Sequence, residues 1–177
     1  MRVSTLFTAA ASIACATFVT ADGAAIVAAL SNVDSETQEL GSRVQDWNGG
    51  LLSSIPIVTQ SAHVLSAIND GTDTADDSDP LTTEEAISIG SAVNTLATTV
   101  NATMTAIINA HDDFEHLLLA PIVLLDLKAQ KSASDDMSSA LLAKVPTALQ
   151  AIASNLAAPI DASFNQAIEV YSISNGI

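Results

Sequence analysis

LTTEEAISIGSAVNTLATTVNATMTAII, residues 81–108, decides the fold, because it joins a helix start signal to the longest periodic apolar pattern in the chain. Thr82 and Glu85 have the spacing of a capping box, in which each side chain bonds to the backbone N–H of the other residue. Apolar positions then recur at steps of three and four, the period of one helix face. They are Ile89, Val93, Leu96, Val100, Met104, Ile107, His111, Phe114 and Leu118. The pattern predicts a long helix with a bend before Pro121, because few helices exceed about 25 residues.

Two further helices are predicted on the N-terminal side of this stretch. One runs from Ile26 to Trp47 on the same spacing and ends at the glycines of residues 48–50, since Gly accepts the left-handed conformation at helix ends. The next is capped by Ser54 and stops where an acidic linker, residues 70–80, begins. This linker has almost no apolar content and separates the second helix from the third.

The sequence after Pro121 predicts further helices, and no part of the chain has a convincing strand pattern. A short helix over residues 122–131 is followed by one that Ser134 caps and that runs to Ile152 with a kink at Pro146. A last helix follows Pro159. We therefore expect an all-α fold without disulfides, an antiparallel bundle of five or six helices around one core.

Residues 1–21 have the features of a secretory signal peptide. Arg2 precedes an apolar run that ends in Val19-Thr20-Ala21, a small-x-small cleavage pattern. A membrane anchor is disfavoured, because the run is short and broken by Ser and Thr, whereas a span needs about 20 apolar residues. Residues 22–177 then form a single secreted domain. The only cysteine, Cys15, leaves with the signal.

The mature chain is strongly acidic. Arg43, Lys128, Lys131 and Lys144 oppose 20 acids, for a formal charge of −16. Such a charge argues against nucleic acid and anionic lipid as partners. The sequence N-A-T at Asn101 matches an acceptor for an N-linked glycan. We expect a soluble extracellular monomer.

The stretch HDDFEH, residues 111–116, is the densest group of potential catalytic or metal-binding side chains. His111 and His116 are five apart, whereas a helical zinc site needs histidines four apart. His63 lacks an acid three residues before it, so the second half of a di-iron motif is missing. We expect no metal here. His111 lies on the apolar stripe, either as a hydrogen-bonded core histidine or as a polar group that lines a cavity.

Recognisable catalytic motifs are missing from the sequence. It has no G-x-S-x-G elbow, no phosphate-binding glycine loop and no cysteine after the signal. We expect a protein that is not an enzyme and needs no cofactor.

Several segments together resemble a known family. They are DWNGG at 46–50, LTTEEA at 81–86, Phe114 followed by LLDLKAQK at 124–131, and ALLAKVP at 140–146. In order and spacing they are similar to the fungal hydrophobic surface-binding protein A family, which includes cell-wall mannoproteins. The resemblance covers about residues 24–173. It implies a helical bundle, secretion or wall residence, adsorption to hydrophobic surfaces and, in some members, fatty-acid binding in an elongated apolar cavity.

The composition agrees with such a cavity, because few aromatic residues remain to fill the interior. Small facing side chains can leave a channel, and Met104 can adapt its shape to a ligand. The candidate lining residues are Val58, Leu65, Val93, Leu96, Val100, Met104, Ile107, His111, Phe114, Leu141, Val145, Ile152 and Phe164. A core filled by these same side chains is the alternative.

The sequence thus predicts a secreted protein that binds fatty acids, other apolar ligands or hydrophobic surfaces. A carboxylate head group should lie at the cavity mouth, near hydroxyls or the clustered Lys128 and Lys131. The alternative function is a structural or antigenic wall mannoprotein without a ligand. Recruitment of a secreted hydrolase stays open.

Overall fold

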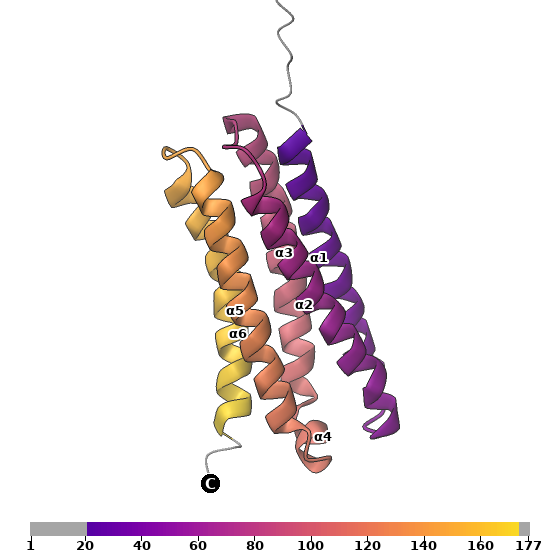
Figure 1. Ribbon diagram of the computed structural model, residues 1–177. Helices are drawn as coiled ribbons and strands as arrows, with labels where there is room; N and C mark the ends of the chain where they lie inside the picture. The colour runs from indigo at the N-terminus through magenta and orange to yellow at the C-terminus, as the bar shows by residue number, and fades with distance from the viewer. Residues whose placement is uncertain (1–20, 174–177) are drawn as a thin grey trace, which may run out of the picture.

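The computed structural model describes residues 21–173, so nearly all of the expected signal peptide lies outside the described residues (Figure 1). These residues form six α-helices and a 3-10 turn, with no strand among them. The helices are α1 (Ala21–Gln45), α2 (Ile55–Asp76), α3 (Thr83–Asn109), α4 (His111–His116), α5 (Ala120–Lys144) and α6 (Gln150–Ile173), and η1 (Leu52–Ser54) precedes α2. The all-α class and the number of helices are confirmed.

The five long helices close a ring in the order α1, α2, α5, α6, α3, because each packs against the next and α3 returns to α1. Helices that follow one another in the chain run in opposite directions, as predicted (Figure 1). Because α3 packs beside α1, however, the ring neighbours α1 and α3 are parallel, and so are α2 and α5, and α3 and α6. The short α4 contacts α3 and α5 at one end of the ring.

The core lies on the ring axis and consists mainly of aliphatic side chains. The apolar stripes of α1 and α3 are buried almost as predicted, since only a face with helical period can point steadily inward. The largest side chains with essentially no exposure are Tyr171, Ile26, Leu30, Leu40, Met104, Leu127, Gln130, Val64 and Thr103. Within residues 21–173, no helix combines the length and apolar character that a membrane span needs.

The capping box at the start of α3 is present. The Thr82 hydroxyl accepts a hydrogen bond from the Glu85 backbone N–H at 3.3 Å, and the Glu85 carboxylate accepts one from the Thr82 N–H at 2.9 Å. The Thr82 hydroxyl also donates to that carboxylate at 2.7 Å. This side-chain bond and the backbone bond lower the pKa of Glu85.

We expect Thr82→Ala to lower the free energy of unfolding by about 1 kcal/mol, the usual cost of losing an N-cap side chain. Thr83→Ala is the matched control, because Thr83 is the next residue, is exposed and is not the cap. Urea unfolding of both variants measures the difference, and equal midpoints would contradict it. Because the pKa of Glu85 is lowered, its contribution is present above the ordinary Glu pKa and is lost as pH falls through that range. The gap between the variants should therefore narrow in acid.

The acidic linker is shorter than predicted, because α2 continues to Asp76. The hydroxyls of Thr72 and Thr74 donate to the carbonyls four residues earlier, and Ala75 is fully buried. Gly71 faces the thioether end of Met137, at a separation that leaves no space for a Cβ. Tertiary packing of these small residues outweighs their weak helix propensity.

The C-terminal boundaries also differ from the prediction. α5 is one helix that passes through Ser134 without a break. It ends at Lys144 because Val145 is extended, with φ −72° and ψ 136°, and the residue before a proline disfavours the helical region. Pro146 therefore ends the helix instead of kinking it. Pro159 lies inside α6 instead of preceding it.

The long helix predicted to run to Leu118 is broken instead of bent, and Leu118, predicted on the apolar stripe, is 84% exposed. α3 ends at Asn109, the six-residue α4 follows, and Leu118 has a φ of 60°, which turns the chain into α5. At the start of α2, Pro56 lies in the first turn, where its missing N–H leaves no helical hydrogen bond unmade. Ser54 is the N-cap residue, but its hydroxyl donates to the Leu51 carbonyl and does not cap the helix.

Candidate ligand-binding cavities

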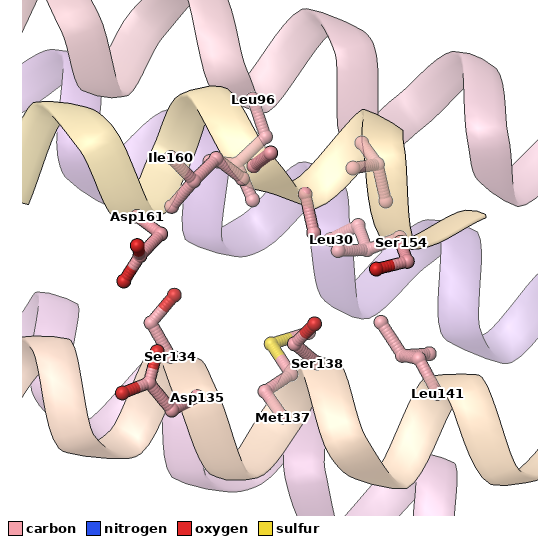
Figure 2. Close-up of a pocket in the computed structure, with 13 residues that line it drawn as sticks. Leu30, Leu96, Ser134, Asp135, Met137, Ser138, Leu141, Ser154, Ile160 and Asp161 are labelled. Carbon is pink, nitrogen blue, oxygen red and sulfur yellow. The ribbon is translucent and has the colours of Figure 1, made fainter. Parts of the chain in front are cut away.

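A cavity of about 260 Å³ lies between α5 and α6, and we call it the α5–α6 cavity. Figure 2 shows side chains of the two helices facing each other across the gap. The facing positions hold small side chains, Ser134 and Ser138 on α5 and Ala157 on α6, which explains why the helices leave space between them. Leu30 of α1 and Leu96 of α3 form its apolar floor. It exceeds the cavity of about 150 Å³ that suffices to bind benzene in an engineered protein.

An ion-pair network lies at the edge of this cavity. The Lys131 ammonium contacts the Asp135 carboxylate at 2.9 Å and the Asp161 carboxylate at 2.5 Å, and so joins α5 to α6. The hydrogen bond to Asp135, and to a smaller extent the one to Asp161, raises the pKa of Lys131. Both aspartates line the cavity. The cavity therefore has carboxylates and serine hydroxyls beside an apolar floor, and Lys131 reaches it through its two aspartate partners.

A much smaller axial cavity, about 20 Å³, lies at the centre of the ring and is lined by all five long helices. It shares Leu96, Ser134, Met137 and Ile160 with the α5–α6 cavity. These side chains stand between the two spaces. Of the four, Met137 is unbranched and changes shape most easily.

A third cavity, about 100 Å³, lies where α2 and α5 begin, and we call it the end cavity. Its walls are apolar, and Ser61 and Asp126 are its polar residues. The apolar lining consists of Leu40, Val44, Ile57, Val58, Ile107, Phe114, Ile122, Val123 and Leu127. It is separate from the α5–α6 cavity, because the two share no lining residue.

A buried polar cluster joins α2 to α5 beside the end cavity. The Ser61 hydroxyl donates a short hydrogen bond to the Asp126 carboxylate, and the Gln130 amide donates to both, at 2.8 Å to Ser61 and 3.0 Å to Asp126. Burial raises the pKa of Asp126, and the two hydrogen bonds only partly oppose it. The Gln130 side-chain oxygen has no hydrogen-bond partner among the described residues. Because Gln130 also lines the axial cavity, that cavity has polar as well as apolar walls.

Asp126→Asn is expected to raise the free energy of unfolding at neutral pH. The pKa of Asp126 is raised by folding, so its ionisation costs stability as pH rises through that pKa. Asn stays neutral, and its oxygen still accepts from Ser61 and Gln130. Urea midpoints at pH 7.5 and pH 3.5 should show a gain at the higher pH that disappears at the lower one. Asp136→Asn, on the exposed side of α5, should show no such pH-dependent gain.

The HDDFEH segment forms α4. His111 Nδ1 lies 3.2 Å from the Asp112 carboxylate, and the imidazole edge packs against the Tyr171 ring with centroids 4.7 Å apart. Potential ligand atoms of His111, Asp112 and Glu115 come within 4.8 Å of one another. Both carboxylates are exposed, and groups of this kind are common on protein surfaces, so we propose no metal site. The interactions of His111 support a hydrogen-bonded histidine at the edge of the core.

The structure distributes the predicted lining residues over several spaces instead of one channel. Val93, Leu96 and Leu141 line the α5–α6 cavity, while Val100, Met104 and Phe164 join Leu96 around the axial cavity. Val58, Ile107 and Phe114 line the end cavity. Val145 lines a hollow of about 50 Å³ beside Val93 and Leu141. Of the remaining three, Leu65 is partly buried against the core, His111 packs on Tyr171, and Ile152 is 58% exposed on α6.

Several residues of the α5–α6 cavity are missing from the sequence prediction. They are Leu30, Ser134, Asp135, Met137, Ser138, Ser154, Ala157, Ala158, Ile160 and Asp161. Leu30, Met137 and Ile160 belong to apolar stripes, so the helical spacing of the sequence could have identified them as interior residues. The serines, alanines and aspartates resemble ordinary surface residues, and nothing in the sequence distinguishes them.

Three other residues named in the sequence prediction have clear locations. Asn101 is an exposed residue in the middle of α3, and its amide donates to the Ser163 hydroxyl of α6 at 3.3 Å. Glycosylation there stays a prediction. Lys131 pairs with Asp135 and Asp161, two residues that line the α5–α6 cavity, whereas Lys128 is exposed on the surface of α5.

Comparison with known proteins gives consistent matches. A family model described as hydrophobic surface binding protein A matches residues 23–143. Cell wall mannoprotein 1 of Aspergillus fumigatus is 34% identical over 145 residues, which cover 82% of this chain and 50% of that protein. Cell wall mannoprotein 1 of Aspergillus flavus is 32% identical over 173 residues, covering 97% of this chain and 63% of that protein. The chain thus spans about half to under two thirds of these relatives.

Solved structures share the fold. AFMP4P in complex with palmitic acid superposes with a TM-score of 0.81 at 23% identity, covering 84% of this chain and 99% of that one. Ligand binding domain 1 of the Penicillium marneffei MP1 protein, complexed with arachidonic acids, gives 0.81 at 19% identity, covering 85% and 98%. At these identities the likeness establishes the helical fold.

Proposed function

Because the chain belongs to the hydrophobic surface binding protein A family, we propose that it is a secreted, non-enzymatic protein that binds a fatty acid or a similar single-chain apolar ligand. The observation that carries this proposal is the α5–α6 cavity, which has an apolar floor and a polar mouth. An alkyl chain gains about 0.8 kcal/mol for each methylene that leaves water. Solved structures of the same fold are complexes with palmitic acid and with arachidonic acids, which supports this class of ligand.

The protein is strongly acidic, so the carboxylate head group of a fatty acid needs hydrogen-bond donors where it binds. The Lys131 ammonium and the hydroxyls of Ser134 and Ser138 offer hydrogen-bond donors there. Asp135 and Asp161 already pair with Lys131, so a ligand carboxylate competes with them for this cation. We propose that the head group stays at this rim, where water also solvates it.

The tail has a path towards the ring axis. Leu96 and Met137 separate the α5–α6 cavity from the axial cavity, so rotation of these side chains joins the two spaces. The axial cavity is too small for an alkyl chain as it stands, at about 20 Å³. A ligand longer than the α5–α6 cavity therefore has to separate α5 from α6 or repack Met137.

A second role, adsorption to hydrophobic surfaces in or on the cell wall, is favoured by a different observation. Large apolar side chains remain exposed on the bundle, among them Leu52, Leu118 and Leu125, each more than two thirds exposed. Large contiguous apolar patches are uncommon on soluble monomers and usually mark contact sites. The wall association of the Aspergillus relatives agrees with this role. A wall mannoprotein with a filled core is the competing function.

Native mass spectrometry of the delipidated, unglycosylated protein tests the ligand proposal. After incubation with palmitate, we expect a mass increase of one or more fatty acids and a higher melting temperature, because a ligand that binds only the folded state stabilises it. Hexadecane, which has no head group, should bind more weakly than palmitate if the polar mouth contributes. A protein whose mass and melting temperature both stay unchanged with palmitate would contradict the proposal and favour a filled core.

A further inference from the structure

The exposed apolar side chains are concentrated at one end of the bundle. Ten large apolar side chains are exposed among the described residues, and seven of them lie in or next to η1, at the start of α2, or between α4 and the first turns of α5. We call this group the apolar end. It consists of Leu51, Leu52, Ile55, Val58, Leu118, Ile122 and Leu125.

These residues belong to one surface, although they come from two parts of the chain. Val58 of α2 and Ile122 of α5 line the same end cavity, so the first turns of these helices lie side by side. Ile55 is three residues from Val58, and Leu125 three from Ile122, which places each pair on one helix face. The α1–α2 connection and α4 lie at the same end in Figure 1. The stacked rings of Trp47 and Phe114, with centroids 4.3 Å apart, join them.

The opposite end carries a concentration of acids. Segment 70–79, which ends α2, contains Asp70, Asp73, Asp76, Asp77 and Asp79, and Glu84 and Glu85 begin α3 beside it. Lys144 is the cation nearest to this group, and its ammonium donates to the backbone carbonyls of Asp76 and Ser78. The bundle is therefore polarised along its axis, with an apolar end and an acidic end.

We infer that the apolar end is the face by which the protein adsorbs to an uncharged hydrophobic surface, and that the bundle then stands upright with its acidic end in water. This inference rests on the proposed adsorption role and assigns it to residues. An uncharged surface fits better than an anionic bilayer, because the exposed Asp112, Asp113 and Glu115 lie at this same end and repel anions. The side chains involved are already exposed, so adsorption requires no unfolding of the ring.

Two matched double variants test the assignment. Ile55→Ser with Ile122→Ser removes two isoleucines of the apolar end, which are 58% and 54% exposed. Ile87→Ser with Ile152→Ser removes two isoleucines of similar exposure, 63% and 58%, from the other end of the bundle. Both variants lose the same chemical groups and the same net hydrophobicity. Their folding is checked by circular dichroism and by thermal unfolding.

Adsorption to octadecyl-coated silica, measured with a quartz crystal microbalance, gives the result. We expect the apolar-end variant to need at least fivefold more protein for half-coverage, while the control variant adsorbs like the wild type. Neither protein should bind vesicles of anionic phospholipid. If the wild type adsorbs and both variants adsorb equally well, the assignment is wrong. If the wild type does not adsorb at all, the adsorption role itself is wrong.

A second copy of the chain could also cover the apolar end, and sedimentation velocity distinguishes such a dimer from a monomer. The inference predicts a monomeric wild type at the concentrations used for adsorption. A wild-type dimer that the apolar-end variant converts to a monomer would overturn the inference and identify the apolar end as a dimer interface.

Discussion

Ala157→Phe is expected to weaken palmitate binding at least about tenfold, because the new ring occupies space that the alkyl chain needs. Ala157 projects into the α5–α6 cavity from α6, and the cavity of about 260 Å³ accommodates a phenyl ring without overpacking the core. Displacing only two methylenes from the cavity costs about 1.6 kcal/mol of binding free energy, slightly more than one factor of ten. Titration of the delipidated variant with palmitate, followed by calorimetry, measures the change.

The control for this variant is Ala151→Phe, which places the same ring on an exposed position of the same helix. We expect its affinity to match the wild type and both variants to melt near the wild-type temperature in the absence of ligand. Unchanged affinity in Ala157→Phe would show that the fatty acid binds elsewhere. The end cavity would then be the next candidate, and Leu127→Trp would test it, because Leu127 is a buried wall of that cavity.

Tyr171→Ala is expected to lower the free energy of unfolding by about 3–5 kcal/mol, as for other large aromatic residues removed from a core. Tyr171 is fully buried, and its hydroxyl donates to the Ile107 carbonyl at 2.7 Å, which ties α6 to the end of α3. Its ring also contacts His111 and lies 6.5 Å from the Phe114 centroid. The substitution therefore leaves a large hollow where α3, α4 and α6 meet. Urea unfolding at pH 7 measures the loss.

Tyr171→Phe separates the hydrogen bond from the packing. It keeps the ring and removes the hydroxyl, so we expect a loss of about 1 kcal/mol, typical of one intramolecular hydrogen bond. If alanine and phenylalanine destabilise the protein equally, the ring packing contributes little and the assignment of Tyr171 as a core anchor is wrong.

Much of the fold follows from local signals in the sequence. The capping box of Thr82 and Glu85 fixes where α3 begins, and the stripe from Ile89 to Ile107 is buried as its spacing predicts. Boundaries were less predictable where tertiary contacts decide them. Gly71 lies in the predicted linker, where glycine usually marks a turn, yet in the structure it lies inside α2 and faces the thioether end of Met137. A single sequence does not distinguish these two uses of glycine.

The candidate site was only partly predictable for a related reason. Leu96 and Val93 were found because they lie on the α3 stripe, which the cavity and the core share. Asp161 was not found, since it is 30 residues from Lys131 and meets it only when α6 folds back along α5. The error in reading α5 as two helices also obscured that Ser134 and Ser138, four residues apart, share one face. Size and polarity of a cavity depend on such pairings between helices.

The ring has a consequence for how the protein responds to hydrostatic pressure. Its helices leave space between them, the α5–α6 cavity of about 260 Å³ and the end cavity of about 100 Å³, both of which open to solvent. Unfolding eliminates the part of this space that water does not fill, so the unfolded chain and its water occupy less volume than the folded protein and water do. Hydrostatic pressure therefore favours the unfolded state, and this effect increases with the volume of unfilled space in the folded protein. An alkyl chain that fills the gap between α5 and α6 removes part of that volume difference, which makes the loaded bundle stiffer and less compressible than the vacant one.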